Sequence, residues 1–173
     1  MASTTQEHVF DPTQGYSQQP VPLAGHAALM GSFAALMGTA VMIGRRRGVR
    51  LPERLSAADV LTAGVATYKL ARLITKDRVT DFARAPFTEL EGRQGRGEVS
   101  ERARGEGVRR AIGELVLCPY CIGVWIAAGF AGGLVIAPRQ TRLAAAALNA
   151  VALADALQMA DRAAAARVER SPR

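Results

Sequence analysis

The sequence predicts an all-α fold: an integral membrane helical bundle of about four helices that ends in a C-terminal helical hairpin. Apolar residues make up 49% of the 173 residues although 21% are charged, which indicates that the two kinds fall into separate blocks. Two blocks, Leu23–Gly44 and Leu115–Ala137, contain no Lys, Arg, Asp or Glu. Each is long enough to cross a bilayer as a helix. The Ala-rich segment that follows the second block has a high helix propensity.

Composition divides the chain into four parts. Residues 1–22 lack Lys and Arg and are rich in Gln, Ser, Thr and Pro, so we expect a disordered tail. Residues 23–44 form an additional transmembrane helix. Residues 56–162 form the main membrane domain, in which 88–110 are a flexible charged loop because glycines and charges of both signs alternate there. Residues 163–173 are a basic tail.

A second helix is predicted to begin near Ala57, because Ser56 followed by Asp59 forms a capping box. This helix is apolar through Tyr68, and three basic residues then share one of its faces: Lys69, Arg72 and Lys76. Long basic side chains can reach lipid head groups from such a position. The helix therefore either spans the membrane with its basic end at the interface, or lies along that interface.

The last two helices are predicted to form the hairpin, connected by Pro138–Arg142. In the first of them, Gly129 and Gly133 form a GxxxG pair that lets another helix approach closely. The second is the most polar candidate span. Three of its side chains share a face that must point into the bundle or to water: Asp155, Gln158 and Arg162.

The distribution of Lys and Arg predicts which ends of the helices are cytoplasmic. The segment from Lys76 to Glu114 carries nine Lys and Arg residues, almost all of them Arg, whereas the hairpin connection carries only Arg139 and Arg142. We therefore expect the central loop and the C-terminus to be cytoplasmic. The arginines Arg45–Arg47 conflict with this arrangement if the second helix spans. With four spans they lie outside, and with three spans they lie inside.

Both cysteines lie in the segment LCPYCIGVW, and three interpretations of the pair Cys118 and Cys121 stay open. A redox dithiol needs a thiolate at a helix N-terminus, which this position offers, but no sheet is predicted to complete a glutaredoxin-like fold. Zinc needs four ligands, and the only histidines, His8 and His26, lie elsewhere in the chain. A metal site is thus the weaker of these two chemical interpretations.

The third interpretation is a structural cysteine pair at the membrane surface. Pro119 can begin a helix without the loss of a needed amide, and Tyr120 and Trp125 suit the interfacial belt. A reducing cytoplasm would then keep both thiols free.

Catalytic and nucleic-acid functions find little support. The chain contains no P-loop, GxGxxG, HExxH or GxSxG motif, so no catalytic residue and no cofactor is assigned. Four carboxylates alternate with basic residues, which indicates a solvated ion-pair surface: Asp77, Asp81, Glu89 and Glu91 among Lys76, Arg78 and Arg84. Aromatic residues make up only 5% of the chain, too few for a base-stacking platform, so no nucleic-acid partner is expected.

Two motifs together resemble a known family. The segment YKLARLITKDRVTDFARAPF, a charged variable stretch and then LCPYCIGVW are similar to bacterial membrane proteins grouped as domain of unknown function 1360, some of which are labelled sporulation proteins. The similarity covers about residues 59–161. The family pattern of an arginine and a following aspartate falls on Arg72 and Asp77, and its CxxCxGxW element falls on the residues Cys118, Cys121, Gly123 and Trp125.

The resemblance implies a multi-pass protein of the bacterial cytoplasmic membrane and a second helix that spans it, but it implies no activity. We expect a non-enzymatic structural or interaction component whose partners are the lipid bilayer and either a second copy or another membrane helix. In this hypothesis Arg72 and Asp77 orient the central loop. The alternative is a thiol-based redox or metal-binding membrane protein that uses the CPYC pair.

Overall fold

The structure is a computed structural model that describes residues 16–17, 21–49 and 51–170. Most of the tail expected over residues 1–22 lies outside the described residues. Residues 163–170, expected as part of a basic tail, instead continue the last helix. The rest of that tail lies outside the description.

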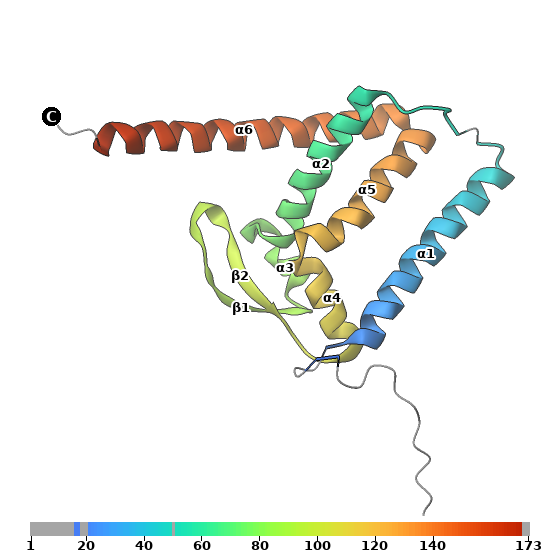
Figure 1. Ribbon diagram of the computed structural model, residues 1–173, viewed down its shortest axis with the longest axis horizontal. Helices are drawn as coiled ribbons and strands as arrows, with labels where there is room; N and C mark the ends of the chain where they lie inside the picture. Colours follow the sequence, from blue (N-terminus) through green and yellow to red (C-terminus); the bar gives the residue numbers. More distant parts are fainter. Residues whose placement is uncertain (1–15, 18–20, 50, 171–173) are drawn as a thin grey trace, which may run out of the picture.

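Helices form most of the described chain (Figure 1). Four long helices are joined by shorter elements, in the order α1 (Leu23–Arg46), α2 (Ala57–Thr75), η1 (Arg78–Thr80), α3 (Asp81–Arg84), β1 (Thr88–Arg93), η2 (Gly95–Gly97), β2 (Val99–Ala103), α4 (Gly107–Leu117), α5 (Pro119–Ile136) and α6 (Pro138–Arg170).

Local sequence signals determine where several helices begin. The Ser56 hydroxyl accepts a hydrogen bond of 3.0 Å from the Asp59 amide, so α2 begins at Ala57 as the capping box predicts. Pro119 opens α5, where its missing amide costs no hydrogen bond. The apolar block 115–137 is therefore not one helix, because the chain turns at Cys118 between α4 and α5.

A two-stranded sheet makes the all-α prediction partly wrong. Strands β1 and β2 pair antiparallel, with a register shift between Leu90 and Gly92. Residues 88–110, predicted as a flexible loop, thus hold this hairpin and the start of α4. The turn contains Gly97 at a φ of +77°, a conformation that favours glycine. The glycines and charged residues of this segment, which predicted a loop, instead lie in the turn of the hairpin and in charged pairs between its two strands.

Three helices are long and apolar enough to cross a membrane: α1, α5 and α6. The second helix, α2, is not among them because it carries Asp59, Lys69 and Arg72 within 19 residues. By length and composition alone, the described residues thus provide three candidate spans rather than the four expected.

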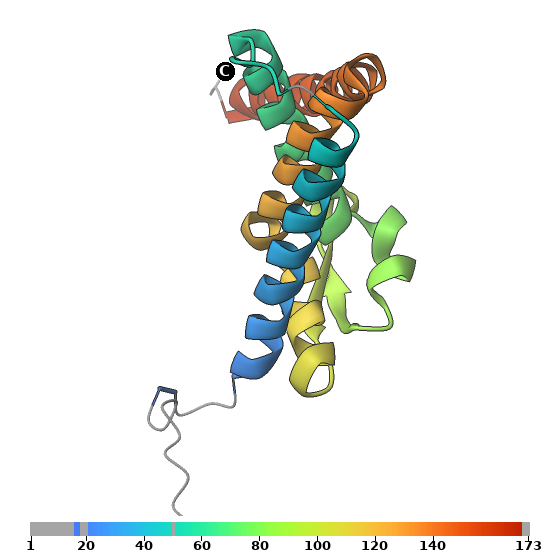
Figure 2. The same ribbon diagram turned by 90° about the vertical axis from the view of Figure 1, so that its right-hand side faces the viewer.

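The small core lies where α2, α5 and α6 meet, around Ala66, Phe130 and Ala145. Helix α1 does not share this core. It lies against α4 at its N-terminal end (Figure 2), and its Phe33 ring contacts Trp125 of α5 edge to face, with ring centroids 4.9 Å apart. The rest of α1 is largely uncovered by protein.

Helices α5 and α6 meet at a sharp corner. The predicted connection Pro138–Arg142 is helical, so only Ala137 separates the two helices. Helix α6 packs more against α2 than against α5, and it crosses α2 before it extends beyond the other helices (Figure 1). Helix α6 thus contacts α5, the partner predicted for the hairpin, and packs more extensively against α2. A Cβ atom on Gly133 would lie 2.6 Å from Thr141 Oγ1, so glycine is what allows the corner to close.

We predict that Gly133→Ala destabilises the bundle relative to Gly129→Ala. Thr141 is β-branched and its hydroxyl is bonded to the Ala137 carbonyl oxygen at 2.9 Å, so it yields poorly to an added methyl group. A methyl group on Gly129 meets nothing within 4 Å. The free energy of unfolding in detergent, measured by circular dichroism in denaturant, should differ between the variants by about 1–3 kcal/mol. Equal stabilities would show that the corner is not tightly packed.

Candidate functional site

A buried ion pair holds the polar part of the molecule together. The side chains of Arg84 and Glu101 are 2% and 4% exposed, and Arg84 Nε lies 2.5 Å from Glu101 Oε2. The Arg84 guanidinium also donates to the Ile74 carbonyl oxygen at 2.5 Å and to Thr80 Oγ1 at 2.7 Å. A buried guanidinium needs this many acceptors to offset its loss of hydration. The predicted solvated ion-pair surface is therefore wrong for Arg84.

The base of the β-hairpin is attached to the same ion pair. Thr88 Oγ1 lies 3.0 Å from the Arg84 carbonyl oxygen and 3.1 Å from Glu101 Oε1. At the other end of the hairpin, Asp77 and Glu98 form an isolated antiparallel bridge. The hairpin is thus fixed at both ends against the segment that follows α2.

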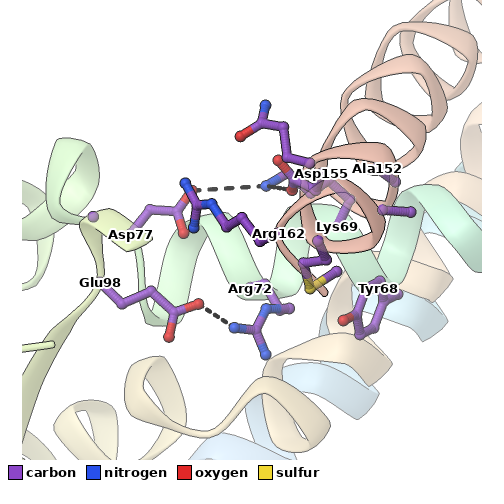
Figure 3. Close-up of a pocket in the computed structure, with 12 residues that line it drawn as sticks. Tyr68, Lys69, Arg72, Asp77, Glu98, Ala152, Asp155 and Arg162 are labelled. Atoms are coloured by element: carbon purple, nitrogen blue, oxygen red, sulfur yellow. Dashed lines mark hydrogen bonds and ion pairs between the residues drawn. The ribbon is translucent and has the colours of Figure 1, made fainter. Parts of the chain in front are cut away.

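A charged cleft lies between α2, α6 and the hairpin tip, with a volume of about 670 Å³ (Figure 3). Lys69, with 9% of its side chain exposed, donates a 2.7 Å hydrogen bond to Asp155 Oδ2 of α6. Its ammonium nitrogen lies 3.8 Å from Asp77 Oδ2, a distance too long for a hydrogen bond. Lys69 is therefore hydrogen-bonded to α6 and forms a longer ion pair with Asp77 in the segment that follows α2.

The two residues matched to the family pattern, Arg72 and Asp77, both line this cleft, but they do not pair with each other. Arg72 forms an ion pair with Glu98 at the hairpin tip, and Asp77 faces Lys69. Arg72 thus contacts the segment that it was expected to orient. Glu98 was not predicted as a site residue, because an acidic residue in a Gly-rich turn carries no sequence signal of the residue that it contacts.

The polar face of α6 completes the cleft. Asp155, Gln158 and Arg162 all line it, as their shared helix face predicts. Arg162 forms no ion pair with any described residue, and Tyr68 contributes an aromatic wall from α2. The charged lining is balanced, with three cationic and three carboxylate side chains: Lys69, Arg72, Arg162, Asp77, Glu98 and Asp155.

A second ion pair joins the other ends of α2 and α6. Arg142 donates from Nε and Nη2 to the two carboxylate oxygens of Asp59, at 2.8 and 2.9 Å. Asp59 lies near the start of α2 and Lys69 lies near its end, and their partners follow in the same order along α6. Helix α6 therefore runs beside α2 in the same direction.

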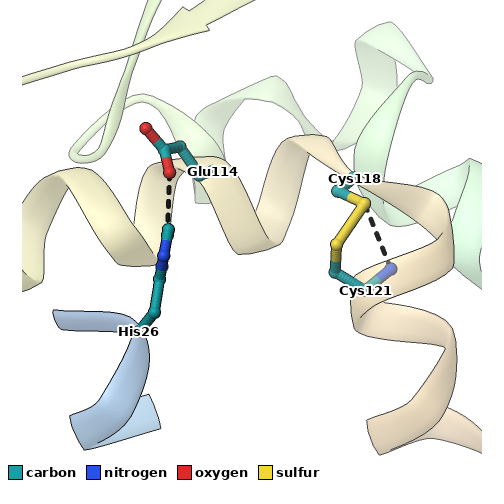
Figure 4. The surroundings of a disulfide bond; sticks show 4 residues. All are labelled: His26, Glu114, Cys118 and Cys121. Carbon is teal, nitrogen blue, oxygen red and sulfur yellow. Dashed lines mark hydrogen bonds and ion pairs between the residues drawn. A yellow bond between two sulfur atoms is a disulfide. The ribbon is translucent and has the colours of Figure 1, made fainter. Parts of the chain in front are cut away.

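The cysteines form the turn between α4 and α5 (Figure 4). Cys118 and Cys121 are at disulfide distance, with Cα atoms 5.2 Å apart, and the Cys121 amide donates to Cys118 Sγ at 3.2 Å. The structure thus contains a disulfide, which differs from the free thiols expected under the interpretation of a structural pair in a reducing cytoplasm. The CxxC spacing across the N-terminus of α5 brings the two sulfur atoms together.

The other residues of the CxxCxGxW element face neighbouring helices. A Cβ on Gly123 would lie 4.0 Å from Thr67 Cγ2 of α2, and Trp125 contacts Phe33 of α1. Among the described residues no group of three or more His, Cys, Asp and Glu side chains could hold a metal ion.

Helix α1 is attached to α4 by a contact that the sequence did not predict. His26 Nε2 lies 2.8 Å from Glu114 Oε2 (Figure 4). Arg110 donates to the other oxygen of Glu114 at 3.0 Å. A Cβ on Gly25 would lie 2.7 Å from Ala111 Cβ, so the two helices are in close contact there. The N-terminal end of α1 thus lies beside α4.

Comparison with known proteins identifies relatives for the central part of the chain. A family model described as "Protein of unknown function (DUF1360)" matches residues 62–161. The sporulation protein YjcA of Bacillus subtilis is 33% identical over 76 residues, which are 42% of this chain and 64% of YjcA. The UPF0713 protein YngL of the same bacterium is 31% identical over 88 residues, which are 50% of this chain and 65% of YngL. The chain thus covers less than two thirds of either relative. No solved structure matches it.

The matched region begins within α2 and ends within α6. It contains the Arg84–Glu101 ion pair and the cysteine turn, and most of the residues that line the cleft. Helix α1 lies outside the matched region, and Arg162 is the first residue after its end. The predicted resemblance is therefore confirmed with nearly the predicted bounds.

We predict that Arg84→Gln abolishes protection of the β-hairpin while Arg102→Gln leaves it nearly unchanged. Loss of Arg84 leaves the Glu101 carboxylate buried without its cation, at a cost of about 3–5 kcal/mol. Arg102, with 67% of its side chain exposed, forms a surface pair with Glu89 that is worth about 0–1 kcal/mol. Amide hydrogen exchange over residues 88–103 measures both effects. Equal protection in the two variants would contradict the role given to Arg84.

Proposed function

We propose a function from the premise that this chain belongs to the DUF1360 family, whose model matches residues 62–161 of its 173. The protein acts as a multi-pass component of the bacterial cytoplasmic membrane, with a structural or interaction role rather than an enzymatic one. The sporulation label belongs to the relative YjcA, and we assign no cellular process from it.

The observation that supports a membrane location is the uncovered apolar surface of three helices. In the apolar windows of α1, α5 and α6, only 0%, 6% and 6% of the residues are buried by the rest of the protein. Exposing such surface to water costs about 25 cal/mol per Å², whereas a bilayer covers it without this cost. Soluble proteins do not leave continuous apolar helices uncovered on this scale.

The positions of the ion pairs support a fourth crossing, by α2. Helix α2 packs beside α5, and the two have similar lengths of 19 and 18 residues. Its ionisable side chains Asp59 and Lys69 have partners on α6, as charged groups within a membrane require. Helices α1, α2, α5 and α6 then cross in alternating directions.

In this arrangement the hairpin and α4 lie on one side of the membrane, together with the N-terminal end of α1. The His26–Glu114 contact places that end beside α4, and Arg162 brings the distal part of α6 to the cleft beside Asp77 and Glu98. The high Lys and Arg content of residues 76–114 favours the cytoplasmic side. Arg45–Arg47 then lie outside, against the usual bias.

The interaction role rests on the surface that α5 leaves open. Gly133 is used within the protein against Thr141, but a Cβ on Gly129 or Gly132 would meet nothing within 4 Å. A second copy of the chain or another membrane helix can approach α5 closely at these two glycines. Arg72 and Asp77 support this role from the cytoplasmic side, because Arg72 pairs with Glu98 of the hairpin tip and Asp77 lies beside Lys69 of α2.

We predict that the protein stays in the membrane pellet after alkaline carbonate extraction and is released only by detergent. Carbonate removes proteins held at the surface by charge, but it leaves those whose helices are covered by lipid. The measurement is immunoblotting of pellet and supernatant from fractionated cells. Release by carbonate or recovery in the soluble fraction would refute the membrane proposal.

A second candidate function, thiol–disulfide exchange, is favoured by the position of the cysteine pair. A hollow of about 460 Å³ adjoins Cys118 and is lined by Arg102, Arg110 and Glu114. In this reaction a partner thiolate attacks one sulfur of the disulfide, forms a mixed disulfide and releases the other cysteine as a thiolate. The partner's second thiol then resolves the mixed disulfide, so the partner is oxidised as the pair is reduced.

We predict that a membrane-impermeant maleimide labels the two cysteines only after cells are permeabilised and treated with reductant. The disulfide blocks both thiols, and the cytoplasmic side shields them in intact cells. Mass analysis of the tagged protein counts the labelled thiols, with Cys121→Ser as the control that leaves one thiol free. Full labelling without reductant would show free thiols and weaken the redox candidate. Labelling of intact cells would reverse the proposed topology.

A further inference from the structure

We propose that the charged cleft binds a zwitterion that carries a phosphate and a primary ammonium group, with the phosphate at Arg162 and the ammonium at Asp77. The head group of a phosphatidylethanolamine-type lipid has this chemistry, as does soluble phosphoethanolamine. Because the cleft adjoins helices assigned to the membrane, the inference of a lipid as the source rests on the proposed function.

Arg162 supplies the phosphate position. It lines the cleft without an ion pair to any described residue, and in Figure 3 its side chain extends from α6 toward the side of the cleft that carries Asp77. A guanidinium binds phosphate through paired N–H donors. Gln158 lies one helical turn earlier on α6 and lines the same cleft, so its amide can add a further donor.

Asp77 supplies the ammonium position. Its carboxylate is 26% exposed, and its only ion-pair contact among the described residues is the 3.8 Å approach of Lys69. Lys69 is already bonded to Asp155 at 2.7 Å, so Asp77 keeps its capacity to accept hydrogen bonds from a primary ammonium. Glu98, paired with Arg72, adds a second carboxylate on the same side of the cleft.

Charge balance favours a zwitterion over a simple anion. The lining holds three cationic and three carboxylate side chains, so a phosphate alone would meet nearby carboxylates that repel it. A ligand with both charges places each beside the opposite charge. Arg162 and Asp77 are the cation and the carboxylate of the lining that have the weakest partners in the protein.

The cleft also has an apolar side suited to lipid chains. Ala152 and Ala156 lie on the lining face of α6, and Tyr68 is exposed on α2. Tyrosine is favoured at the level of lipid head groups. A head group bound at Arg162 and Asp77 would thus leave its acyl chains along these residues, toward the apolar part of α6.

The test uses native mass spectrometry of the purified full chain in a neutral detergent, titrated with three phospholipids that have identical acyl chains. Phosphatidylethanolamine should bind tightest. Phosphatidylcholine has no ammonium N–H to donate, and phosphatidylglycerol has no ammonium. Arg162→Gln should lower the affinity for phosphatidylethanolamine about tenfold, the effect of losing one charged hydrogen bond, and Asp77→Asn should remove the preference over phosphatidylcholine.

The matched control is Arg167→Gln, which removes the same charge from the same helix at an exposed position outside the cleft. Competition by soluble phosphoethanolamine identifies the source: displacement of the lipid shows that the head group suffices, and no displacement shows that the acyl chains are required. Equal binding of the three lipids, tightest binding of phosphatidylglycerol, or equal behaviour of Arg162→Gln and Arg167→Gln would overturn the proposal. Carbonate extraction tests the membrane location separately.

Discussion

The polar part of this protein depends on the buried ion pair between Arg84 and Glu101. A two-stranded hairpin is at best marginally stable by itself, and Val99 is the only fully buried apolar residue in the two strands. The hairpin is held instead by Arg84, which also bonds the Ile74 carbonyl oxygen near the end of α2. Because Glu98 lies in the same hairpin, the cleft has its shape only while this ion pair is intact.

The elements predicted correctly from the sequence are those with strong local signals. The apolar run of α1, the Ser56 cap of α2 and Pro119 at the start of α5 each act within a few residues. The hairpin was missed because its stabilising partner, Arg84, lies outside it, and a single arginine among charged residues is expected to be exposed. The corner at Gly133 was missed for a related reason, since a GxxxG pair does not say which helix approaches it.

The sequence predicted several of the residues that line the candidate site, but it did not predict which residues these side chains contact. Helical periodicity placed Asp155 and Arg162 on one face, and the family pattern selected Arg72 and Asp77, all of which line the cleft. Their partners are far away in the sequence: Arg72 meets a residue 26 positions later, and Lys69 meets one 86 positions later. Contacts at such separations depend on how the helices pack, which composition and spacing do not determine.

The two ion pairs between α2 and α6 explain how a helix joined by a single-residue corner keeps one orientation. Most of α6 is alanine and leucine, so its faces offer α2 similar apolar contacts. Paired charges removed from water gain little net stability, but a wrong register leaves them unpaired at a high cost. Asp59–Arg142 and Lys69–Asp155 therefore select one face and one register of α6. Arg162 lies two turns beyond Asp155 on that face, so the pairs that orient α6 also direct Arg162 into the cleft.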